Sequence, residues 1–204
     1  MPLRETLVRI LNEYPAAKHE ASKGHPLGNF LRHDAEDAVA DGLGEFAAGR
    51  IVEGSAGKGP WAAVPWISVF DPAVTTSATA GYYVVYLFHV SEPIVHLSLN
   101  QGTTAVHDEF GRSTRAVLRD RAEFMRKRVA DFQPGLPIMD INLGSNVGLP
   151  GDYMAGHALG VTYSLETLPI ARRSAAHCTG LSGADVSRRH RGRCRAAGRA
   201  GGRI

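Results

Sequence analysis

The sequence has few cysteines, few tryptophans and no long apolar run. Its two cysteines, Cys178 and Cys194, lie near the C-terminus outside any paired metal-ligand pattern, so we expect neither a disulfide framework nor a cysteine-held metal. No apolar run approaches the ~18 residues of a membrane-spanning helix, and the first residues contain no apolar signal core. These absences predict a cytoplasmic protein without a membrane segment, a metal or a cofactor.

Charge is divided unequally along the chain. Residues 1–170 hold 14 Lys and Arg against 19 Asp and Glu, whereas residues 171–204 hold nine Arg and one acid. The formal net charge of +3 and the pI of about 9.0 therefore describe the C-terminal segment. They are no sign that residues 1–170 bind nucleic acid through a generally basic surface.

Hydrophobic periodicity ends near Ala171, which predicts two regions. Residues 1–170 are expected to form one domain. Residues 171–204 are rich in Arg, Ala and Gly and are expected to bury too little apolar surface to become ordered. A nucleic-acid arm and a localisation signal are two interpretations of this tail. A truncated or out-of-frame end, encoded by a GC-rich gene, is the third and the one we favour.

The periodicity before the tail predicts the fold. Helical spacing of apolar residues is found over 3–14, 26–40 and 113–131. Strands are predicted over 64–70, 81–90, 94–99 and 160–165, and the Gly/Pro-rich segment 134–151 is predicted to be a surface loop. This order predicts an α/β or α+β domain with a mixed, largely antiparallel sheet flanked by helices.

Two motifs that suggest enzymes are incomplete. Gly57-Lys58-Gly59 resembles part of a phosphate loop, which needs a Gly six residues before the Lys and a Ser or Thr after it. Val52 and Gly59 stand at those positions. The polar cluster at residues 33–37 lacks a strand-borne acid-x-Lys pair to complete a nuclease centre, and a solvated helix face explains it better.

Four arginines in the predicted helix over 113–131 and just before it share one direction. At 100° per residue they fall within about 60° of one another; they are Arg112, Arg115, Arg119 and Arg126. Such a row can neutralise phosphates, which dominate nucleic-acid affinity. A solvated face with long side chains covering apolar surface explains it equally well.

Three ordered blocks resemble a known family. They are Ser55-Ala-Gly-Lys-Gly-Pro-Trp-Ala-Ala-Val-Pro-Trp66, Gly81-Tyr-Tyr-Val-Val-Tyr-Leu-Phe88 and Leu97-Ser-Leu-Asn-Gln-Gly102. Together they resemble the McrB-type N-terminal domain, the DNA-recognition module of modification-dependent restriction systems. The resemblance runs from about residue 3 to 165 and stops where the Arg-rich tail begins.

The resemblance implies a mechanism and a set of base-binding residues. Well-understood members flip a modified cytosine out of the duplex into an aromatic pocket. Trp66, Tyr83 and Leu87 match positions that line this pocket, whereas Trp61 is interpreted as a core aromatic. Lys58 stands where the cytosine-flipping relative has a tyrosine. Lysine cannot stack as tyrosine does but can contact a phosphate or a polar modification, so the modification read stays open.

We therefore expect a DNA-recognition module that binds modified DNA by base flipping and has no nuclease or NTPase activity of its own. Its expected partners are DNA and a separate or fused nuclease or GTPase. Two alternatives remain. One is a pocket protein for a small molecule or a modified nucleotide, and the other is a non-functional remnant of a longer restriction endonuclease.

Overall fold

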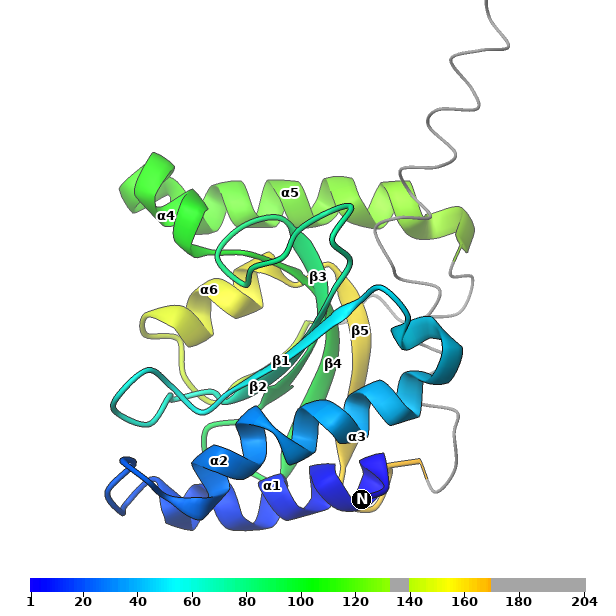
Figure 1. Cartoon of the computed structure of the whole chain (residues 1–204). Helices are drawn as coiled ribbons and strands as arrows, with labels where there is room; N and C mark the ends of the chain where they lie inside the picture. The colour runs from blue at the N-terminus through cyan, green and yellow to red at the C-terminus, as the bar shows by residue number, and fades with distance from the viewer. Residues whose placement is uncertain (133–139, 170–204) are drawn as a thin grey trace, which may run out of the picture.

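The structure is a computed structural model that describes residues 1–132 and 140–169. Three helices come first: α1 (Leu3–Ala17), α2 (Pro26–Arg32) and α3 (Asp34–Leu43). Four strands follow: β1 (Ile51–Ser55), β2 (Trp66–Phe70), β3 (Tyr82–Phe88) and β4 (Ile94–Gln101). The chain then forms α4 (Thr104–Phe110), α5 (Thr114–Val129), α6 (Leu149–Gly156) and β5 (Leu159–Ser164), as Figure 1 shows. The predicted tail over 171–204 lies outside the described residues.

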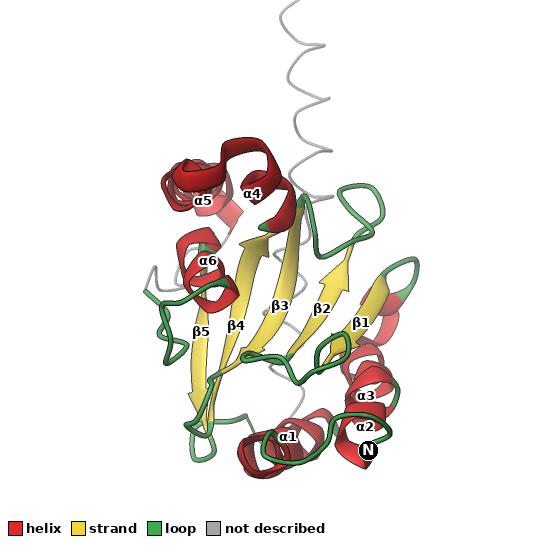
Figure 2. Ribbon diagram, turned by 90° about the vertical axis from the view of Figure 1, so that its left-hand side faces the viewer, coloured by secondary structure: helices red, strands yellow, loops and turns green. Residues whose placement is uncertain are grey.

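The five strands form one sheet in chain order, β1-β2-β3-β4-β5, and every neighbouring pair is antiparallel (Figure 2). Antiparallel neighbours can follow one another through short turns, as β3 and β4 do around Ser91-Glu92-Pro93. β5 joins the edge of β4 after the chain has passed through α4, α5 and α6. The predicted α/β domain with a largely antiparallel sheet flanked by helices is confirmed.

The two faces of the sheet are covered differently. One face packs against α1, α2, α3 and the second half of α5, and this contact forms the main core. On α1 the core side repeats at helical spacing, with Leu7, Ile10, Leu11 and Tyr14 all buried. The other face carries a smaller cluster that is packed by α6 and by Ile141 and Leu143. The second face is therefore covered by fewer helices than the first.

The single helix predicted over 26–40 is wrong in one respect, because the chain bends at His33. There φ and ψ are −136° and −73°, which is not a helical conformation, and α2 ends where α3 begins. Each helix has its own start signal. Pro26 occupies the first turn of α2, and the His25 ring accepts a hydrogen bond from the Leu27 amide. Acidic residues fill the first turn of α3, where they favour the positive end of the helix dipole.

Three further elements were not predicted, and the first of them is α4 (Thr104–Phe110). The surface loop predicted over 134–151 is corrected at its end, because α6 begins at Leu149 with Pro150 in its first turn, a position that tolerates proline. Residues 133–139 of that prediction lie outside the described ranges. Strand β1 has a weak pattern, since Ile51 is exposed and Gly54 is buried.

Within the described ranges, none of the helices is both long and apolar enough to cross a membrane.

Candidate nucleic-acid interface

Strands β2 and β3 place three of the predicted base-binding residues on one side of the sheet. Trp66 begins β2 and is the register partner of Leu87 on β3. Tyr83 lies four residues before Leu87 and therefore faces the same side of the strand. With Phe70 and Val85 they form a surface that we call the aromatic face. Tyr83 and Leu87 are buried there, whereas Trp66 is half-buried and keeps contact with solvent.

Tyr83 is held in place by its hydroxyl group. Its Oη lies 3.1 Å from the Ala78 carbonyl oxygen and 3.4 Å from that of Gln101, and it donates its proton toward them. The ring stands edge-on to Phe70, with 5.2 Å between centroids. Burial raises the pKa of the Tyr83 phenol, so the group stays protonated. Tyr83 braces the aromatic face in this structure, and Trp66 is the ring that solvent reaches.

The loop between β1 and β2, residues 56–65, is fixed by two aromatic side chains. Tyr14 Oη on α1 donates to the Ala62 carbonyl oxygen at 2.8 Å, and Trp61 Nε1 donates to the Glu20 carbonyl oxygen at 2.9 Å. The Tyr14 and Trp61 rings meet edge to face, with centroids 5.3 Å apart. Trp61 is half-buried and packs against the outside of the main core, so it contributes to packing without being enclosed in the core.

Lys58 lies at the tip of this loop, and the backbone around it is closed tightly. The Ala62 amide donates to the Ala56 carbonyl oxygen at 2.7 Å across the loop. Gly57 has a φ of 111°, and a Cβ there would overlap backbone atoms on the far side of the loop. The Lys58 side chain is exposed. The loop therefore presents this lysine from an ordered backbone.

Two further cations lie beside the tip. Arg32 on α2 donates from Nη2 to the Gly57 carbonyl oxygen at 3.2 Å. The Ser22 hydroxyl donates to the Gly59 carbonyl oxygen, so the exposed Lys23 next in sequence lies at the same end of the molecule. The α1–α2 connection and the β1–β2 loop project from the same side in Figure 1. We call Lys23, Arg32 and Lys58 the tip cations.

Two of the four predicted row arginines hold helices together. Arg115 Nε donates to Asp152 Oδ1 at 2.8 Å, and its Nη2 donates to the Asn146 carbonyl oxygen at 2.9 Å. Arg126 Nη2 donates to the His157 carbonyl oxygen at 3.0 Å. These bonds join α5 to α6 and to the residues on either side of it. Their donors are thus largely occupied within the domain.

The other two row arginines face solvent. Arg112, just before α5, and Arg119 on α5 are both exposed, and neither has a hydrogen bond or an ion pair with another described residue. The row predicted from helical spacing therefore divides into an internal pair and an exposed pair. Arg112 and Arg119 are the members that can meet an external anion.

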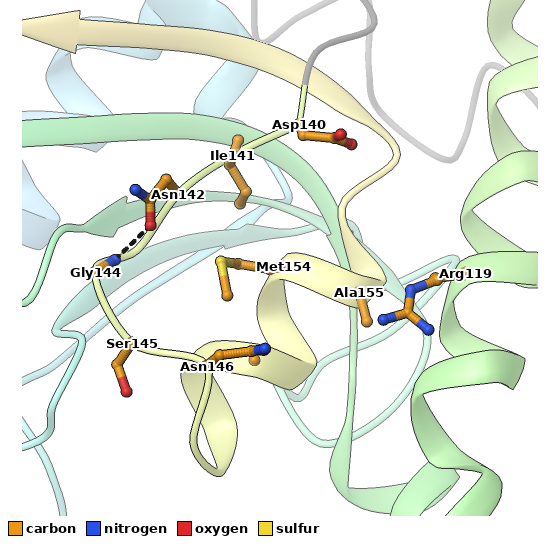
Figure 3. Close-up of a pocket in the computed structure, with 10 residues that line it drawn as sticks. Arg119, Asp140, Ile141, Asn142, Gly144, Ser145, Asn146, Met154 and Ala155 are labelled. Atoms are coloured by element: carbon orange, nitrogen blue, oxygen red, sulfur yellow. Dashed lines mark hydrogen bonds between the residues drawn. The ribbon is translucent and has the colours of Figure 1, made fainter.

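Arg119 also borders an open pocket of about 570 Å³ between α5, α6 and the segment 140–146. Figure 3 shows Arg119 reaching from α5 toward α6, with Asn142, Ser145 and Asn146 on the other side. Several of these polar groups already have partners, since Asn142 Oδ1 accepts from the Gly144 amide at 2.9 Å. None of the predicted base-binding residues lines this pocket.

Strand β4 carries buried polar residues at every second position on the same side of the sheet as the aromatic face. These strand residues are His96, Ser98 and Asn100. They hold α6 and the residues on either side of it through hydrogen bonds with Asn142, Tyr153 and His157. Sequence reasoning missed this network, although a period of two is visible in His96-Leu-Ser-Leu-Asn100. Among the described residues, no group of three or more His, Cys, Asp or Glu could hold a metal ion.

Sequence reasoning also missed Glu53 and Ser68. The two residues are register partners on β1 and β2, and they lie beside Trp66 on the aromatic-face side of the sheet. A single Ser or Glu in a five-residue strand forms no pattern that could have marked it. Only the pairing of the two strands brings them together.

The antiparallel sheet with helices packed on both faces defines an α/β domain, and Trp66 is half-buried on one face of it. Residues 9–173 match the family model described as the MrcB-like, N-terminal domain. Since this match covers most of the chain, the protein belongs to that family, which comprises DNA-binding recognition modules of McrB-type restriction systems. Comparison with curated proteins and with solved structures gave no match.

Proposed function

We propose that this domain recognises modified DNA by taking the modified base out of the duplex and stacking it on Trp66. The half-buried Trp66 indole, aligned with Leu87 in the next strand, is the observation that carries the proposal. Extruding a base costs a few kcal/mol. Stacking on an aromatic side chain returns about 1–3 kcal/mol. The two terms nearly cancel, so contacts to the base edge and to phosphates supply the net affinity.

The tip cations support backbone contacts next to the stacked base. The described domain carries an excess of acids, so its affinity for DNA must come from local groups of cations. Lys58 stands on a backbone that Tyr14, Trp61 and Arg32 fix, so little side-chain or loop entropy beyond its own is lost on binding. Lys58 therefore binds a phosphate or a polar modification near the extruded base.

The exposed arginines of the row extend this contact. Arg112 and Arg119 bind phosphates farther along the duplex, while Arg115 and Arg126 position α5 by holding it to α6. Phosphate contacts fix register and carry no sequence information, so they leave specificity to the base. DNA cleavage is then the task of a partner or fused domain that carries a nuclease or a GTPase, and the present chain supplies recognition.

A binding panel tests the proposal. Full-length protein is titrated at fixed salt against matched duplexes that are unmodified, methylated, hydroxymethylated, glucosylated or phosphorothioated. We expect one modified base to be preferred, and Trp66→Ala to weaken that preference with the melting temperature retained. Phe46→Ala, at a 52% exposed ring on the 3-10 helix Gly44–Ala47, is the matched aromatic control. Equal binding of all duplexes by wild type, unchanged in Trp66→Ala, would refute base flipping.

The pocket beside Arg119 favours a second candidate function. A volume of about 570 Å³ falls within the range that small ligands occupy. The protein would then bind a free small molecule or modified nucleotide without a duplex. Titration with free modified nucleosides and nucleotides separates the two functions, because stacking on Trp66 would be lost in Trp66→Ala and binding beside Arg119 would be lost in Arg119→Ala.

A further inference from the structure

Ser68 carries a hydroxyl group that the fold leaves without a partner. Its side chain is fully buried, at 0% exposure, between Trp66 and Phe70 on β2. Among the described residues, no group forms a hydrogen bond with Ser68 Oγ. A buried polar group without a partner costs about 1–3 kcal/mol, and alanine would fit the same place without this cost. The hydroxyl therefore points to a ligand that completes it.

Glu53 lies opposite Ser68 on the neighbouring strand. It is the register partner of Ser68 across the β1–β2 pair, and directly opposed residues on one face have Cβ atoms about 4.5–5.5 Å apart. Glu53 is half-buried, and no hydrogen bond or ion pair joins it to another described residue. As the partner of Ser68 in an antiparallel pair, Glu53 lies on the aromatic-face side of the sheet.

The two groups offer complementary hydrogen bonds. A carboxylate only accepts, whereas a serine hydroxyl both donates and accepts. Cytosine presents an amino group next to a ring nitrogen that accepts, and adenine presents the same order on its pairing edge. Thymine-type bases present a carbonyl oxygen where cytosine has its amino group. A carboxylate facing that carbonyl oxygen could form no hydrogen bond with it, because both groups only accept.

We infer that Glu53 and Ser68 read the pairing edge of the extruded base and select a base that carries an exocyclic amino group. Glu53 accepts from the amino group, and the Ser68 hydroxyl donates to the adjacent ring nitrogen. Trp66 supplies the stacking surface for either class of base, so the choice between amino and carbonyl edges rests on the two strand residues. This inference rests on the proposed base flipping.

Matched probes isolate the base edge. Each probe is a duplex with one test base opposite an abasic site, so that no base pair has to be broken. The pairs are 5-methylcytosine against thymine, 5-hydroxymethylcytosine against 5-hydroxymethyluracil, and adenine against hypoxanthine. Within each pair only the amino group is exchanged for a carbonyl oxygen and the neighbouring ring proton moves. In the pair that binds most tightly, we expect wild type to prefer the amino base about tenfold, the value of one charge-assisted hydrogen bond.

Two variants test the assignment. Glu53→Gln can donate as well as accept, so its preference is expected to fall toward unity. Glu45→Gln, at an exposed glutamate on the 3-10 helix Gly44–Ala47, removes the same charge and should keep the wild-type preference. Ser68→Ala should bind the amino base several-fold more weakly while its melting temperature is equal or higher. If Ser68→Ala fails to fold, Ser68→Cys keeps a polar atom at this position in a slightly larger side chain, weakens the hydrogen bond and should show the same loss.

The possible failures are distinguishable. Equal binding of amino and carbonyl probes by wild type, or an unchanged preference in Glu53→Gln, would overturn the inference that Glu53 and Ser68 select an amino base. If Trp66→Ala abolishes binding in the same assay, base flipping stands and only the roles of Glu53 and Ser68 fail. If Trp66→Ala binds every probe as wild type does, the proposed function itself fails.

Discussion

Arg115 and Asp152 join α5 to α6 through a 2.8 Å hydrogen bond between Nε and Oδ1. The guanidinium group lies so close to the backbone of α6 that a Cβ on Gly151 would overlap it. The side chain of Asp152 is mostly covered, at 13% exposure, so the pair is only partly screened by water. Arg115, which the sequence pattern suggested as a phosphate ligand, thus links α5 to α6 within the domain.

Arg115→Ala is therefore expected to lower the free energy of unfolding by about 1–2 kcal/mol, because the Asp152 carboxylate loses its charged partner. Arg112→Ala removes the same side chain at an exposed position and should change stability by less than about 0.5 kcal/mol. Urea denaturation of both variants checks the contrast. A loss of equal size in the two would show that the Arg115–Asp152 pair contributes nothing.

DNA affinity of Arg119→Ala should depend less steeply on salt. Each phosphate that is neutralised contributes about 0.9 to the slope of log affinity against log salt concentration. We expect the slope to fall by about one in Arg119→Ala, and by about two when Arg112→Ala is added. Arg128→Ala, on the opposite side of α5, is the matched control and should keep the wild-type slope. An unchanged slope in the double variant would assign Arg112 and Arg119 to a solvated face.

Acid should destabilise the domain through His96. Its Nε2 donates to the Asn142 carbonyl oxygen at 2.8 Å, and its Nδ1 lies 2.8 Å from the Thr162 hydroxyl oxygen. Burial lowers the pKa of His96 below its ordinary 6.5, outweighing the opposite effect of the Asn142 carbonyl oxygen. Between the lowered pKa and 6.5 the unfolded chain binds more protons, so the free energy of unfolding falls as the pH falls.

Denaturation midpoints measured between pH 7.5 and 5.5 should show this loss beginning near pH 6.5. His96→Gln should be less stable at pH 7.5 and should show a flatter pH dependence. His107→Gln, at a side chain 67% exposed on α4, should keep the wild-type pH dependence. If His96→Gln and wild type lose stability in parallel on acidification, another group is responsible.

Two glycines of similar burial should respond oppositely to alanine. A Cβ at Gly54 on β1 would overlap the Leu31 backbone carbonyl, and the Gly54 amide donates to Glu36 Oε1 at 2.7 Å. Gly54→Ala should therefore cost more than about 2 kcal/mol, because α2 and α3 must move away from β1. Gly28 lies inside α2, where a Cβ would meet the movable end of Arg32. Gly28→Ala should be neutral or stabilising by up to about 1 kcal/mol, as helix propensity favours alanine. Thermal unfolding of the two variants decides the matter.

The parts of the fold that sequence predicted are those with a strong local period. The helical spacing of apolar residues predicts α1, and these residues are Leu7, Ile10, Leu11 and Tyr14. Alternation along β3 correctly predicts that Tyr82 and Tyr86 lie on one face of the sheet and Tyr83 on the other. The break at His33 was missed because the apolar spacing continues across it. Strand β1 was missed because its stability comes from pairing with β2 and not from its own residues.

The candidate site was predictable only where side chains carry a motif. The family resemblance marked Trp66, Tyr83 and Leu87, and strand register places all three on one face. Spacing alone could not separate Arg115 from Arg119, because the difference lies in Asp152, which is 37 residues away along the chain from Arg115. Likewise, only the β1–β2 register brings Glu53 opposite Ser68, and this pairing could not be predicted from either residue alone.

The bonds from Tyr14 and Trp61 have a consequence for how mutants of the N-terminal helix are interpreted. These rings hold the loop that carries Lys58. Helix α1 therefore supports a surface that it does not itself form. A lesion that melts α1 would release the loop and register as poor recognition in a binding assay. Such a variant can lose affinity although the substituted residue never contacts the nucleic acid. The order of the 56–65 loop should therefore be measured in each α1 variant before its residue is interpreted as a DNA contact.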